Sequence, residues 1–178
     1  FTDYATIRPH IRLKDGLTRN IVWPTVGLWN VSGAGGDIIL MLGPEPSLKW
    51  RLFSEQILGV ADHFNSSLML TLGALLADVP HSRPVQIIGT ANDAELVDRF
   101  NLQRSRYEGP TGIIGVLHDA CEHASLPSAA LWAAVPAYAS QVPSPKASLS
   151  LMRRSCEMIG TPAPVATVMN LIERYEEQ

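Results

Sequence analysis

Residues 104–124 read RSRYEGPTGIIGVLHDACEHA, and this stretch, with the run that follows it, decides the fold. The segment 107–112 combines glycine and proline as tight turns do, and it leads directly into a helix predicted over 112–124. The apolar residues of that helix recur at helical spacing, at Ile113, Leu117, Ala120, Cys121 and Ala124. A strand-like apolar run then covers 131–135. Turn, helix and buried strand in this order predict an α/β protein.

The composition is that of a folded domain. The chain has 178 residues, of which 46% are hydrophobic and 17% charged, and this excludes general disorder. The net charge of −3 shows no basic excess, so we expect neither nucleic acid nor an anionic membrane surface as a partner. The apolar runs fall short of the roughly 20 residues that a membrane span needs. Because the first residues also lack signal-peptide features, we expect a cytoplasmic protein with its two cysteines reduced.

Strands and helices are predicted along most of the chain. The apolar run 38–42 suits a strand of a parallel sheet covered on both faces, and with a helix over 48–64 and a strand over 68–72 it predicts a βαβ unit. The segment 73–77 fits either one helical turn or an irregular loop. Further strands are predicted at 11–13 and 21–23, around a turn at 14–16, and at 26–31 and 85–88. Further helices are predicted at 92–100 (capped by Asn92), 145–159 and 165–177.

These elements predict one α/β domain over 1–178. The expected architecture is a three-layer α/β/α fold with a mostly parallel or mixed central sheet. Residues 161–178 contain the last helix, which either packs on this domain or reaches out to a partner as an appended segment.

The known catalytic and nucleotide-binding motifs are absent from the sequence, including the phosphate loop, the dinucleotide fingerprint and the zinc-protease helix. On the helix over 112–124, His118 with Cys121 and Asp119 with His123 have spacings that could ligate a metal. The two pairs point to different faces, and an exposed ion pair explains the second without a metal. We therefore predict no metal site. His81, in a proline-bounded loop, fits a polar site or an ordinary turn.

A candidate ligand site lies where the predicted strands end, because ligands of open parallel sheets bind beyond the carboxyl ends of the strands. The amides of Gly112 and Ile113 begin a helix there, where an anion can bind. The candidate ligand-binding residues are Glu45, Thr90, Glu108, Thr111, Gly112 and Tyr138. The alternative is that Glu45, Glu108 and Thr111 cap helices and satisfy turns. No positioned nucleophile or base pair appears, so we name no catalytic residue and no cofactor.

Several segments come in an order that resembles one family. They are Gly43-Pro44-Glu45-Pro46, Thr71-Leu72-Gly73-Ala74-Leu75, Pro80-His81-Ser82-Arg83-Pro84, Gly89-Thr90-Ala91, Tyr107-Glu108-Gly109-Pro110-Thr111-Gly112 and Ser144-Pro145-Lys146-Ala147. The chain resembles the proteasome assembly chaperone family, second-subunit type, in its actinobacterial branch. The resemblance covers most of the chain from Asp3 to Gly160, and the 107–112 turn is its most specific piece.

The resemblance implies a phosphorylase/hydrolase-like fold, no established catalytic activity, and a homo-oligomer, with a trimer among the options. Relatives in other lineages assist assembly of the proteasome α-ring, so proteasome α-subunits are the implied partners. Family chains begin with a strand that precedes the position of Phe1, and we expect a first strand to be missing here.

Two functional hypotheses follow. The first is a non-catalytic assembly or scaffold protein, with apolar surface on the Trp23 to Trp29 strands or on the final helix as its interface. The second is a binding protein or enzyme for a nucleoside- or phosphate-like small molecule at the strand-end rim, and it rests on analogy of fold.

Overall fold

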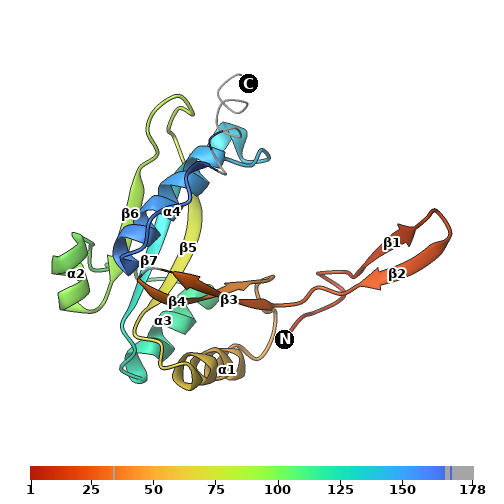
Figure 1. Ribbon diagram of the computed structural model, residues 1–178, viewed down its shortest axis with the longest axis horizontal. Coiled ribbons are helices and arrows are strands. Elements are labelled where there is room, and N and C mark those ends of the chain that lie inside the picture. Colours follow the sequence, from red (N-terminus) through yellow and green to blue (C-terminus); the bar gives the residue numbers. More distant parts are fainter. Residues whose placement is uncertain (34, 167–168, 170–178) are drawn as a thin grey trace.

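A three-stranded mixed sheet forms the centre of the computed structural model, which describes residues 1–33, 35–166 and 169 (Figure 1). The strand order is β5-β7-β6. The middle strand β7 (Ser128–Pro136) runs parallel to β5 (Met69–Ala77), with Met69 opposite Ser128. It runs antiparallel to β6 (Ile87–Ala91).

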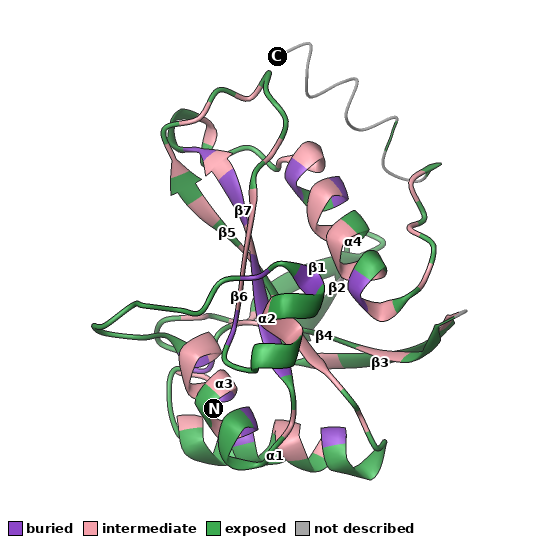
Figure 2. Ribbon diagram, turned by 90° about the vertical axis from the view of Figure 1, so that its left-hand side faces the viewer, coloured by how far each residue is buried: buried purple, intermediate pink, exposed green. Residues whose placement is uncertain are grey.

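β7 is buried along most of its length because both faces of the sheet are covered (Figure 2). On one face, Leu131 belongs to a core cluster with Met158 of α4 (Pro145–Ile159) and Phe100 of α2 (Ala94–Phe100). On the other face, Ser128 contacts α3 (Ile113–His123), and α1 (Trp50–His63) packs on α3 from outside. Helices, sheet and helices make three layers, and the predicted α/β fold is confirmed.

Small residues let the layers approach closely. Ala129, Ala133 and Leu131 of β7 have no exposed surface. Gly73 of β5 pairs with Trp132, and a Cβ atom on Gly73 would lie 2.5 Å from the indole ring. A glycine at this position therefore leaves the room that the large ring needs.

Two hairpins precede this core. β1 (His10–Lys14) and β2 (Thr18–Val22) pair antiparallel around a turn in which Asp15 and Gly16 have positive φ, as the Asp-Gly pair predicts. This hairpin projects away from the rest of the molecule (Figure 1). β3 (Gly27–Gly33) and β4 (Gly36–Leu42) form the second hairpin.

The strand predicted at residues 38–42 does not pair with the strand that we expected. The run does form a strand, but β4 pairs with β3 and does not join the central sheet, so no βαβ unit forms through α1. Leu42 is 73% exposed rather than buried on both faces. The parallel pair is β5 with β7, and α3 leads into its second strand. An apolar run indicates a strand, but it does not indicate which other strand pairs with it.

Several boundaries also differ from the prediction. β5 continues to Ala77, so the ambiguous segment 73–77 is strand. Asp93, rather than Asn92, caps α2 by accepting a hydrogen bond from the amide of Leu96 at 2.8 Å. A 3-10 turn, η1 (Ala137–Ala139), follows β7. Most of the helix expected at 165–177 lies outside the described residues. Within the described part, none of the helices is long and apolar enough to cross a membrane.

Candidate functional site

Three of the six candidate residues lie together at the start of α3. The carboxylate of Glu45, in the loop after β4, accepts a hydrogen bond from the amide of Ile113 at 2.9 Å. A Cβ atom on Gly112 would lie 3.0 Å from the same carboxylate oxygen, and Thr111 precedes it. Glu45 thus satisfies a free amide of the helix N-terminus and places its negative charge at the positive end of the helix dipole. The carboxylate of Glu45 already occupies the position at which an anion was expected.

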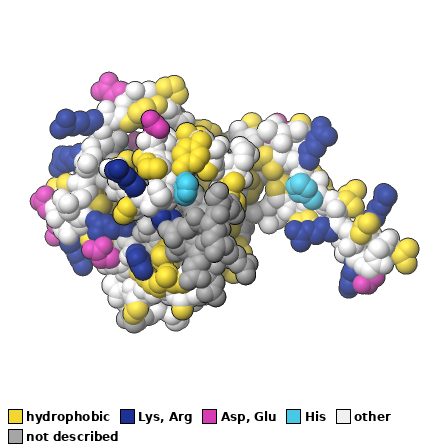
Figure 3. Space-filling view, turned by 90° about the horizontal axis from the view of Figure 1, so that it is seen from above, with side chains coloured by type: hydrophobic (Ala, Val, Ile, Leu, Met, Phe, Trp, Pro, Cys, Tyr) yellow, Lys and Arg dark blue, Asp and Glu magenta, His cyan; other side chains and the backbone are white. Residues whose placement is uncertain are grey.

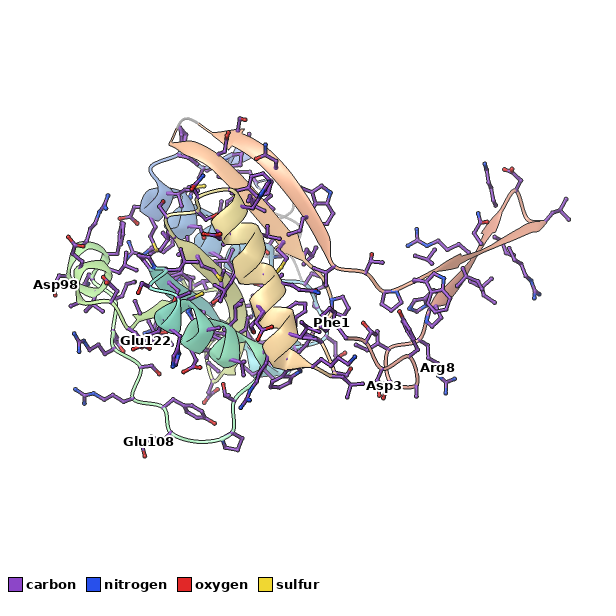
Figure 4. The ribbon with its side chains drawn as sticks, turned by 90° about the horizontal axis from the view of Figure 1, so that it is seen from below. Phe1, Asp3, Arg8, Asp98, Glu108 and Glu122 are labelled. Carbon is purple, nitrogen blue, oxygen red and sulfur yellow. The ribbon has the colours of Figure 1, made fainter. Side chains whose placement is uncertain are left out.

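The other three candidates are spread over the molecule. Tyr138 lies in η1, beyond the carboxyl end of β7. Thr90 pairs with Ala130, six strand positions before Pro136, which corresponds to about 20 Å along β7. Glu108 is exposed on the loop before α3 and points outward (Figure 4). Thr90 does not share a rim with Tyr138, because β6 runs antiparallel to β7 and its carboxyl end lies at the opposite end of the sheet.

A cavity of about 260 Å³ does lie beyond the carboxyl ends of β5 and β7. The polar residues that line it are Asp78, His81, Arg83, Gln86, Ser144 and Lys146. Binding pockets for small molecules usually measure roughly 300–1,000 Å³, so this cavity lies just below their range.

Hydrogen bonds fasten the loop that forms this cavity. The hydroxyl of Tyr138 accepts from the amide of His81 and lies 2.8 Å from Nδ1 of the same residue. The ammonium of Lys146 donates to the carbonyl of His81 at 3.1 Å. Tyr138 was therefore predicted at the correct end of the strands, His81 was predicted to belong either to a polar site or to an ordinary turn, and Lys146 was not among the candidates. The proline-bounded polar loop was the sequence signal for His81.

A second polar cluster lies half-buried between α3 and the sheet. Nε2 of His118 lies 2.7 Å from the hydroxyl of Thr71 on β5, and Nδ1 lies 2.8 Å from the hydroxyl of Ser128 on β7. Burial lowers the pKa of His118 below its usual value, so its ring stays neutral in the folded protein at pH 7. These contacts join a helix to two strands, which is a structural role.

The cysteine and the second histidine of this helix also have structural explanations. Burial raises the pKa of the Cys121 thiol, an effect that a hydrogen bond with Ser128 opposes, and its Sγ lies 3.4 Å from the sulfur of Met69. His123 pairs with the carboxylate of Asp119 at 3.6 Å on the exposed side, as the spacing indicated. In the described ranges, His, Cys, Asp and Glu side chains nowhere form a group of three that could hold a metal ion.

Large apolar side chains gather instead on the two N-terminal hairpins and on the segment 23–26 that joins them. Trp23 and Trp29 are 51% and 54% exposed, and Ile11 and Leu13 of β1 are both 60% exposed. Seen from above, hydrophobic and basic side chains follow one another along the projecting hairpin (Figure 3). Exposed apolar surface of this extent is typical of a protein-binding surface.

Comparison with known proteins gives the family. The model of the PAC2 family matches residues 1–178. A PAC2 family protein from Streptomyces avermitilis is 40% identical with a TM-score of 0.87, over 97% of this chain and 74% of that one. A Mycobacterium tuberculosis protein, the proteasome-assembly chaperone homologue Rv2125, is 43% identical with a TM-score of 0.88, over 98% of this chain and 75% of that one.

A more distant structure, the proteasome-assembly chaperone homologue PbaA of Pyrococcus furiosus, is 17% identical with a TM-score of 0.68, over 99% of this chain and 75% of that one, and it supports the fold alone. A search of curated proteins found no match. The family model and the two relatives that are at least 40% identical agree with the resemblance found in the 107–112 turn and the other segments. The chain belongs to the PAC2 family, which is related to proteasome assembly chaperones.

Proposed function

We propose that this protein is a non-catalytic assembly protein that acts by binding other protein chains, as a homo-oligomer and with proteasome α-subunits as its partners. The observation that carries the proposal is the exposed apolar surface on the β1–β2 and β3–β4 hairpins. Membership of the PAC2 family supports the choice of partner, since the Mycobacterium tuberculosis relative is a proteasome-assembly chaperone homologue.

The chemistry of the hairpin surface supports a protein partner. Trp23 and Trp29 are more than half exposed, and tryptophan is enriched among the residues that dominate binding energy at interfaces. Arg12, Lys14 and Arg19 give the first hairpin positive charge beside its exposed apolar residues. Protein–protein interfaces usually combine apolar and polar side chains, with arginine enriched. The proposal keeps the sequence-based expectation of a cytoplasmic protein.

Native mass spectrometry tests this function. The protein is measured alone and after co-expression with the proteasome α-subunit of the same organism. A stoichiometric mixed complex supports the proposal, and the double variant Trp23→Ser/Trp29→Ser should reduce that complex at least tenfold. The matched control is Leu52→Ser, which changes an exposed residue of α1 outside the hairpins.

The small-molecule alternative is tested on the same sample. Thermal unfolding is followed with added inorganic phosphate and nucleosides, which the strand-end cavity would have to accept. If these ligands raise the unfolding temperature and the α-subunit does not bind, the assembly function is contradicted. If the α-subunit binds and the ligands have no effect, the assembly function is supported.

A further inference from the structure

The β1–β2 hairpin, residues 10–22 and hereafter the arm, has one apolar face. Ile11 pairs directly with Ile21, and Leu13 pairs with Arg19. Cross-strand partners share a face and neighbours along a strand alternate, so Ile11, Leu13 and Ile21 lie on one side of the arm together with Arg19. His10, Arg12, Lys14 and Asn20 lie on the other side.

This pattern is that of a strand pair with one face against a core, yet the described part of the chain provides no such core for it. Ile11, Leu13 and Ile21 are 60%, 60% and 57% exposed. A lone two-stranded hairpin is only marginally stable in water. Among the described residues, the apolar face therefore has no cover.

The arm is also held in an extended position. Pro9 and Pro24 flank it, and each fixes its own φ. The ring of Tyr4 meets the ring of Trp23 edge-on, with 5.0 Å between the centroids. Phe1 packs in the same manner on Phe53 of α1 at 5.4 Å, which ties the preceding segment to the domain.

The turn before the arm is closed by Asp3, near Arg8 (Figure 4). Its carboxylate accepts from the amide of Ala5 and the hydroxyl of Thr6, both at 2.9 Å. An arm fixed in this way loses little conformational entropy on binding, which favours association.

Charge indicates what covers the arm. The arm contains three basic residues and one acidic residue, whereas the rest of the chain contains 11 basic and 16 acidic residues. The arm is therefore positive, and the remainder of each copy is negative. A second copy of the same chain offers the arm a body of opposite net charge.

We infer that the arm packs its apolar face on the body of a second copy of this chain, so that each copy gives an arm and receives one. This inference rests on the homo-oligomer of the proposed function and names the segment that builds it. In a closed symmetric assembly every copy makes the same exchange, and no arm remains uncovered.

Sedimentation equilibrium of the full chain and of a triple variant, Ile11→Ser/Leu13→Ser/Ile21→Ser, tests the inference. The wild-type chain should be an oligomer, and the triple variant should raise the dissociation constant at least 100-fold. The control His10→Ser/Asn20→Ser changes the opposite face of the arm and should stay oligomeric. Thermal unfolding shows whether each variant keeps its folded core.

A charge variant gives an independent measurement. Arg19→Glu reverses a charge on the contacting face while Ile11, Leu13 and Ile21 stay in place, and it should weaken the assembly at least tenfold. Raising the salt concentration should weaken the wild-type assembly in the same direction, because salt screens exposed charges.

Cross-linking locates the contact. Isotopically labelled and unlabelled chains are mixed, and amines are joined to carboxylates with a zero-length reagent. In the variant Arg19→Lys, the amine introduced on the contacting face should form mixed-isotope links to acidic residues of the body of another copy. A monomeric wild-type chain, an oligomer that survives the triple variant, or links from this amine only within its own chain would each overturn the inference.

The same samples separate this inference from the proposed function. An unchanged complex with the α-subunit, together with an oligomer that the triple variant leaves intact, rejects the arm exchange and keeps the assembly function. Loss of assembly in the triple variant, in a protein that ignores the α-subunit, supports the arm exchange and rejects that partner.

Discussion

β7 and the two strands of the β1–β2 arm are all rich in apolar residues. β7 is nevertheless the most buried strand, whereas the arm is exposed. Leu131 of β7 has no exposed surface, whereas Leu13 of β1 is 60% exposed. β7 has a neighbouring strand on each side and helices on both faces, while each strand of the arm has only the other. We conclude that β7 stabilises the fold and that the arm is available for binding. The following predictions test this difference.

The largest effect is expected in the core. Leu131→Ala removes a fully buried side chain that packs with Phe100 and Met158, and it should lower the free energy of unfolding by about 2–5 kcal/mol. Urea denaturation of the wild type and the variant measures the difference. A loss below about 1 kcal/mol would show that β7 is not the centre of the core.

The buried histidine should give the core a pH dependence. Its pKa is lowered in the folded protein, so the unfolded chain binds the proton more readily. The contribution of His118 to stability is fully present above its ordinary pKa of 6.5 and is lost as the pH falls below that value. Thr71→Val removes one hydrogen-bond partner of the ring and should cost about 1–3 kcal/mol at pH 7.5.

The measurement for His118 is urea denaturation at pH 7.5 and pH 5.5, on the wild type and on His118→Gln. The variant should lose part of the difference between the two pH values. His123→Gln is the matched control, because the pKa of that exposed residue is shifted upward, first by its hydrogen bond to the backbone of Asp119 and then by the Asp119 carboxylate. Equal pH dependence in the wild type and in His118→Gln would contradict the buried, neutral ring.

A smaller effect is expected at the edge of the core. Asp93 caps α2, whose Phe100 belongs to the core cluster. Asp93→Ala should cost about 1 kcal/mol in the free energy of unfolding. The neighbouring variant Asn92→Ala is the control, because Asn92 does not cap the helix and bonds Glu122 on the surface. If both variants cost the same, the assignment of the cap to Asp93 is wrong.

The smallest effect is expected at the tip of the arm. Leu17 is 89% exposed, and Leu17→Ser should change the free energy of unfolding by less than about 0.5 kcal/mol. Urea denaturation at a protein concentration low enough to dissociate any assembly makes the comparison with Leu131→Ala direct. A loss of several kcal/mol would mean that the arm is part of the folding unit.

Local patterns predicted the elements well. The turn predicted at 14–16 formed, with positive φ at Asp15 and Gly16, and α4 covers 145–159 as predicted. The candidate site was predicted less well. The side chain of Glu45 caps α3 at Ile113, which lies 68 residues further along the chain. No local pattern indicates this contact. Thr90 was misplaced because the antiparallel direction of β6 cannot be deduced from its own residues.

The sequence by itself determined which segments are strands and helices, where most of them turn, and which family the chain resembles. Those features depend on side-chain periodicity, on turn residues and on short segments in a fixed order. Only the tertiary structure decided that β4 pairs with β3, that β6 runs antiparallel to β7, and that no other described residue covers the apolar face of the arm. Strand pairing and burial are set by contacts between residues far apart in the chain, and a pattern within one segment does not specify its neighbours.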